Sequence, residues 1–168
     1  MNSLSKTQKL AMSGMVMALY IVIMNLTQSF SFGQYQVRIA TALYALSYPM
    51  PFLVLPLAVS NLLSNMLMGG MGVADMLGGF TVGLLTAGCN AFLGKRRWNS
   101  WFTMLPITLI PSLGVSTYLS GLLQLPYWTL AASLIVGQLI AGLVGAAGLQ
   151  VLRRVPGLHM SVKTASQV

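Results

Sequence analysis

The feature that most constrains this chain is a succession of long apolar runs with very little charge between them. Runs that reach or approach the ~20 residues a helix needs to cross a bilayer occupy residues 10–30, 52–68, 76–93, 101–123 and 128–152. Only 6% of the residues are charged, whereas soluble domains average roughly 25%. So few charged side chains cannot coat a water-facing surface. The sequence therefore predicts an all-α integral membrane protein that forms a single domain over residues 1–168.

A sixth apolar run, at residues 37–48, decides the topology. It is short and carries Arg38 near its start, so by length alone it could lie at the membrane surface. Basic clusters favour the cytoplasmic side, and they lie at Lys6 and Lys9, at 95–97, and at Arg153, Arg154 and Lys163. All of them reach that side only if the short run crosses. We therefore predict a six-helix transmembrane bundle with a short second span and cytoplasmic N- and C-termini.

The net charge of +8 could indicate nucleic acid as a partner, but the clusters flank apolar runs, where they act as topology signals and contact anionic lipid headgroups. Catalysis is also disfavoured. Asp75 is the only carboxylate side chain, and the chain has one histidine and one cysteine, too few for an acid–base pair or a metal site. No glycine-rich nucleotide loop with its lysine is present. We predict no enzymatic activity, no cofactor, no metal and no nucleic acid.

Small residues recur at four-residue spacing, a pattern that lets helices approach closely in lipid. The pattern indicates packing within the bundle for two lines, which are Gly79, Gly83, Ala87 and Ala91, and Gly137, Ala141 and Gly145. A third line, Gly14 and Ala18 with Ala11 one turn away, has two interpretations. It packs within the bundle, or it docks another membrane subunit.

Polar residues gather in the outer half of the predicted bundle. The candidate binding residues are Gln36, Arg38, Thr41, Asn61, Asn65, Asp75 and Gln138. An Arg or Asp at the centre of a membrane costs ~2.5–3.5 kcal/mol on the insertion scale, so such groups need a reason to be there. In one interpretation Arg38 and Asp75 pair while the amides cross-link helices. In the other the groups line an outward-open pocket for a planar heterocycle, with Phe32, Tyr35 and Tyr44 as stacking faces.

Two stretches carry a family resemblance. They read FGQYQVRIATALYALSY from residue 32 and VSNLLSNMLMGGMGVADMLGGFTVGLLTA from residue 59. They resemble the QueT family, the substrate-binding S components of energy-coupling factor (ECF) transporters. The residues that match the family's three motif blocks are Phe32, Gly33, Gln36, Arg38 and Leu43, then Ser60, Asn61 and Ser64, then Asp75 and Gly79. The resemblance covers about residues 10–145.

The resemblance implies a micronutrient-binding subunit in a bacterial cell membrane, with a pocket facing outward beneath the first loop. It implies a queuosine precursor, a deazaguanine base, as the solute. It also implies docking to a transmembrane T component and two ATPase subunits, and the family's docking motif on its first helix corresponds to Gly14 and Ala18.

Two positions depart from the family pattern. Thr41 and Gln138 stand where the family has glutamate, and each change replaces a carboxylate by an uncharged polar group. The departures indicate a ligand less cationic than the aminomethyl base, such as the nitrile precursor. Two other functions remain open, namely a scaffold that only binds helices and a stand-alone facilitator.

Overall fold

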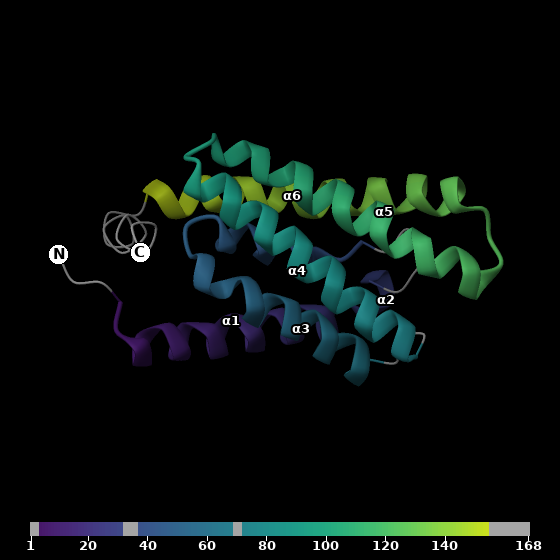
Figure 1. The fold of residues 1–168 in the computed structure, drawn as a ribbon, viewed down its shortest axis with the longest axis horizontal. Helices are drawn as coiled ribbons and strands as arrows, with labels where there is room; N and C mark the ends of the chain where they lie inside the picture. The colour runs from purple at the N-terminus through teal and green to yellow at the C-terminus, as the bar shows by residue number, and fades with distance from the viewer. Residues whose placement is uncertain (1–3, 32–36, 69–71, 155–168) are drawn as a thin grey trace.

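The computed structural model describes residues 4–31, 37–68 and 72–154, and these residues are helical with no strand among them. Figure 1 shows an elongated bundle whose long helices run roughly along its length. The elements in chain order are α1 (Lys6–Leu26), α2 (Gln28–Ser31), the 3-10 helices η1 (Ile39–Ser47) and η2 (Pro51–Leu53), α3 (Val54–Leu67), α4 (Val73–Lys95), the 3-10 helix η3 (Ser100–Thr103), α5 (Met104–Leu123) and α6 (Tyr127–Arg154).

Four of these segments are long and apolar enough to cross a membrane, which marks a multi-pass membrane protein. They are Lys6–Leu26, Val73–Lys95, Ser100–Leu123 and Tyr127–Arg154. Each coincides with a predicted run. The predicted third span corresponds to a shorter apolar segment, Pro51–Leu67.

The short second run forms the 3-10 helix η1 in the core of the bundle. It packs against α1, α4, α5 and α6, and Ala40 and Tyr44 have no exposed surface. This burial excludes a position on the surface of the bundle. A 3-10 helix rises about 2.0 Å per residue, compared with about 1.5 Å in an α-helix. The nine residues of η1 are therefore longer along the helix axis than nine residues of α-helix would be.

Glycines on the neighbouring helices make room for η1. A Cβ atom at Gly145 on α6 would lie 2.7 Å from the carbonyl oxygen of Ala42, and one at Gly94 on α4 would overlap the carbonyl of Tyr48. Gly83 is equally confined, because its Cβ would meet the Tyr44 hydroxyl at 2.8 Å. The small-residue lines predicted for α4 and α6 therefore bring helix backbones into close contact, as expected for packing in lipid.

The small-residue line on α1 faces the other way. Ala11, Gly14 and Ala18 are all exposed, and a Cβ at Gly14 would meet nothing within 4 Å. The buried side of α1 carries Tyr20 and Met24 instead. The interpretation that this line packs against the described part of the bundle is therefore wrong. The interpretation that it docks another membrane subunit stays a prediction.

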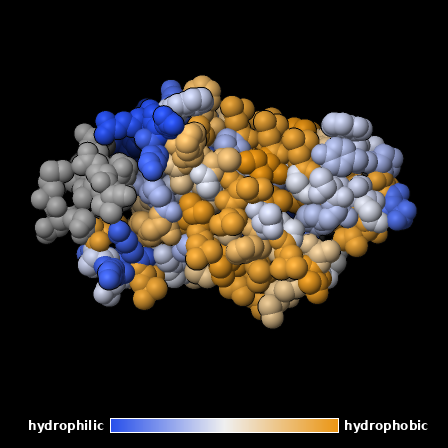
Figure 2. All heavy atoms as spheres, in the orientation of Figure 1, coloured by the Kyte–Doolittle hydropathy of each residue, from blue (hydrophilic) through white to orange (hydrophobic). Residues whose placement is uncertain are grey.

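Basic residues gather at one end of the molecule. Figure 1 places the start of α1, the end of α4 and the end of α6 together, and Figure 2 shows hydrophilic residues there beside a broad apolar middle. Two cation–π contacts tie this end together, because Lys9 lies 5.9 Å from the Phe52 ring and Arg153 lies 5.0 Å from the Tyr48 ring. The basic clusters therefore share one end of the bundle, and the cytoplasmic placement of that end stays a prediction of the positive-inside rule.

Candidate ligand-binding site

The buried charge at the centre of the candidate site is Arg38, which caps the start of η1 and is 4% exposed. Its guanidinium donates from Nη1 to Asn61 Oδ1 at 3.2 Å and from Nη2 to Asn65 Oδ1 at 3.1 Å. Its Nε donates to the carbonyl oxygen of Ser31 at 3.5 Å. A buried guanidinium is tolerated only when acceptors surround it, and here three acceptors come from two other segments.

The two asparagines are held in place by α4. They lie four residues apart and therefore on the same face of α3. Their amide nitrogens donate to carbonyl oxygens that are also four residues apart, Asn61 to Gly79 at 2.8 Å and Asn65 to Asp75 at 3.1 Å. Because both nitrogens are used in this way, both amide oxygens are turned toward Arg38.

Helical geometry places the polar residues of η1 in one line. Arg38, Thr41, Tyr44 and Ser47 are spaced by three residues and all are buried. In a 3-10 helix, side chains at positions i and i+3 eclipse one another. An α-helix would rotate each successive member by about 60° and carry the last one to the opposite face. The 3-10 conformation therefore keeps the polar groups together.

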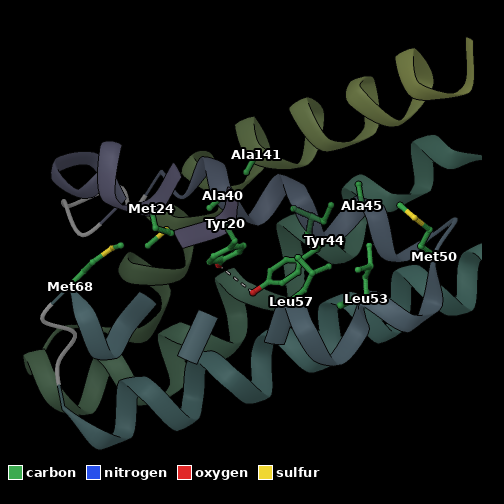
Figure 3. Packing of buried hydrophobic residues seen from close by; sticks show 12 residues of the cluster. Tyr20, Met24, Ala40, Tyr44, Ala45, Met50, Leu53, Leu57, Met68 and Ala141 are labelled. Carbon is green, nitrogen blue, oxygen red and sulfur yellow. Dashed lines mark hydrogen bonds between the residues drawn. The ribbon is translucent and has the colours of Figure 1, made fainter. Parts of the chain in front are cut away.

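The aromatic hydroxyls extend the network toward α1. The Tyr44 hydroxyl accepts from Asn61 Nδ2 at 3.0 Å and lies 3.4 Å from the Tyr20 hydroxyl. Figure 3 shows these two hydroxyls pointing toward each other within the apolar core. Tyr20 was not predicted as part of the site, and a tyrosine in the middle of an apolar run is the signal that could have found it.

A second tyrosine that the sequence did not identify holds the only carboxylate. The Tyr118 hydroxyl on α5 donates to Asp75 Oδ1 at 2.8 Å. Asp75 is 4% exposed and lies in the first turn of α4, where the helix dipole favours a negative charge. This contact joins α4 to α5 beside the asparagine pair.

Thr41 on η1 and Gln138 on α6 are in direct contact. The Thr41 hydroxyl lies 2.8 Å from Gln138 Oε1 and 2.6 Å from the carbonyl oxygen of Arg38. A hydroxyl has one proton, so it donates to only one of these oxygens. The other contact is completed when the Gln138 amide turns by 180° and donates from its nitrogen. The amide and hydroxyl groups are both uncharged.

These groups surround a small cavity inside the bundle. It measures about 10 Å³, which is about the room that one water molecule needs. Its lining residues are Arg38, Thr41, Tyr44, Asn61, Val82, Pro111, Val115, Leu134 and Gln138. One wall is thus polar and the other apolar, the combination that small-molecule sites share. A larger ligand requires the apolar wall on α4, α5 and α6 to move outward.

Most of the predicted site residues come together here. Arg38, Thr41, Asn61 and Gln138 line the cavity, whereas Asn65 and Asp75 lie in the surrounding hydrogen-bond network without lining it. Gln36 lies outside the described residues, as do Phe32 and Tyr35. The apolar wall was not predicted, because valine and leucine in a membrane span carry no signal of their own.

Comparison with known proteins identifies one family. The family model described as QueT transporter matches residues 10–154, which span every segment of the site. Neither the curated proteins nor the solved structures contain a match.

The hydrogen bonds from Asn61 and Asn65 to α4 depend on the absence of a side chain at Gly79. A Cβ atom there would lie 2.5 Å from Asn65 Nδ2. We predict that Gly79→Ala destabilises the protein by about 1–3 kcal/mol, the usual cost of overpacking. Gly88→Ala is the control, because a Cβ at this α4 glycine meets nothing within 4 Å, and a stabilisation of about 0.4–1 kcal/mol is expected because alanine restricts the unfolded chain. Thermal unfolding in detergent measures the stability of both variants. Equal melting temperatures of the two variants would contradict the close approach of α3 and α4 at Gly79.

Proposed function

Because this chain belongs to the QueT transporter family, we propose that it is the substrate-binding subunit of an ECF-type micronutrient importer in a bacterial cell membrane. Partner ATPases would supply the energy, since the sequence holds no nucleotide-binding loop of its own. The solute would be a queuosine precursor, that is, a deazaguanine base.

The observation that carries this proposal is the buried arginine at a partly polar cavity. A charged residue inside a membrane span is a candidate functional residue, because placing its charge in the membrane costs free energy and such residues usually have a function. Structural cross-linking alone does not need Arg38, because Asn61 and Asn65 already bind α4 directly. A guanidinium, amides and a hydroxyl match the donors and acceptors on the edge of a guanine-like base.

The arrangement of the helices supports entry of the solute from outside. In our proposal the chain crosses the membrane six times, η1 being the second crossing, and both termini are cytoplasmic. Arg38 lies at the start of η1 and Asp75 at the start of α4, whereas the basic cluster at 95–97 follows the end of α4. The site then lies in the half of the bundle that is remote from the cytoplasm.

The exposed face of α1 is the proposed docking surface for the transmembrane T component. Ala11, Gly14 and Ala18 leave a shallow strip there, beside the exposed side chains of Leu10 and Met15. Small residues on an exposed helix face allow a second helix to approach closely in lipid.

We predict that a deazaguanine base stabilises the purified protein by about 2.7 kcal/mol at a hundredfold excess over its dissociation constant. Asn61→Ala should remove this stabilisation, because it removes an acceptor of Arg38 and a lining side chain. Asn25→Ala changes the same residue type at an exposed position of α1 and should respond like the parent protein. Thermal-shift measurements in detergent test all three. If no deazaguanine base raised the melting temperature, a scaffold function would be favoured.

A second prediction concerns docking. Gly14→Leu combined with Ala18→Leu should abolish uptake into cells that contain the T component and ATPases, while binding of the base stays unchanged. Gly121→Leu is the control, because this glycine is exposed on α5 and has open space around it. Uptake by the double variant at the parent rate would refute the docking surface. Uptake into liposomes that hold this chain alone would indicate a facilitator instead.

A further inference from the structure

We propose that the cavity selects a solute without positive charge and that Gln138 is the residue that sets this preference. The inference rests on the proposed function, because it concerns the same cavity, and it specifies the class of solute more closely. The favoured ligand is an uncharged planar heterocycle with an amide-like or nitrile acceptor. The disfavoured one is the same ring with an ammonium group.

The lining of the cavity carries a positive charge and no negative one among the described residues. Arg38 is the only charged residue among those that line the cavity in the described part of the chain. The whole sequence has a single carboxylate side chain, Asp75. This side chain does not line the cavity, and one of its oxygens accepts from Tyr118. An ammonium group in the cavity would lose its water and gain a guanidinium rather than a carboxylate as its neighbour, which disfavours the charged form.

The amide of Gln138 is the uncharged polar group that α6 contributes to the cavity. This residue is 3% exposed and lines the cavity from α6. Its Oε1 is in contact with Thr41, and no hydrogen bond between described residues uses its Nε2. A donor at the cavity wall that no protein group uses can form a hydrogen bond with a ligand that supplies the acceptor, and this adds to the affinity.

The amide also explains which neutral groups suit the cavity. With the Thr41 proton on Oε1, the Gln138 nitrogen is available to donate to a carbonyl, a ring nitrogen or a nitrile. With the Thr41 proton on the Arg38 carbonyl, the amide turns and its oxygen is available to accept from a ring N–H. Either orientation pairs with an uncharged edge. Neither orientation provides a negative charge that would compensate the charge of a desolvated ammonium group.

Two deazaguanine bases that share one ring test this inference. One carries a nitrile and is neutral, and the other carries an aminomethyl group, which is a cation at neutral pH. We expect purified protein in detergent to bind the nitrile base tighter by roughly tenfold or more, equivalent to about 1.4 kcal/mol. Equal affinities, or tighter binding of the aminomethyl base, would overturn the inference while leaving the proposed function intact. If neither base bound, the proposed solute class would fail and the inference with it.

Replacing the amide by a carboxylate tests the role of Gln138 directly. Gln138→Glu should shift the ratio of the two affinities toward the aminomethyl base by roughly tenfold or more, because a carboxylate of the same shape supplies the missing counter-charge. Gln150→Glu places the same charge on α6 outside the cavity lining and should leave the ratio unchanged. Where Gln138→Glu lowers the melting temperature too far for binding to be measured, Thr41→Glu introduces the carboxylate from η1. An unchanged ratio in a folded variant of either kind would refute the assignment.

Discussion

Keeping a guanidinium inside an apolar bundle is the constraint on which the rest of this structure depends. Arg38 cannot be left without acceptors in hydrocarbon, and Asn61 and Asn65 provide them from α3. Those amides hold their orientation because α4 offers two carbonyl oxygens at the same four-residue spacing, and the Tyr44 hydroxyl also accepts from Asn61. Gly79 in turn must lack a side chain so that α3 and α4 come close enough. A single buried charge thus determines residue types on two neighbouring helices, α3 and α4.

The second requirement is the 3-10 conformation of η1. It aligns polar side chains at three-residue spacing, and it makes the segment longer along its axis than an α-helix of the same number of residues. Its backbone lies against glycines of α4 and α6, where any larger residue would collide with it. The cavity then lies between a polar wall, to which η1 and α3 contribute most, and an apolar wall from α4, α5 and α6. Widening the apolar wall costs few hydrogen bonds, so that wall is the one expected to yield to a ligand.

Much of this arrangement could be predicted from sequence, because lipid imposes simple rules. Run lengths located the helical segments, and the small-residue spacing on α4 and α6 identified packing faces. The positions of Arg38, Asn61 and Gln138 in otherwise apolar runs predicted a shared pocket, and these residues line one cavity in the structure. The contact of Thr41 with Gln138, and that of Tyr118 with Asp75, could not be predicted. Each contact joins residues far apart in sequence. The spacing of polar residues along a run predicts which face of a helix is polar, but it does not predict which other helix that face contacts. The run at 37–48 also carried no local signal that favours a 3-10 helix over an α-helix.

Whether the cavity beside Arg38 is the solute site can be determined from a structure of the protein with a bound deazaguanine base. We expect the base within hydrogen-bond distance of the Arg38 guanidinium and the Gln138 amide, with Val82, Val115 and Leu134 displaced outward. A base bound elsewhere on the protein, with this cavity still about large enough for one water molecule, would show that the cavity is not the solute site.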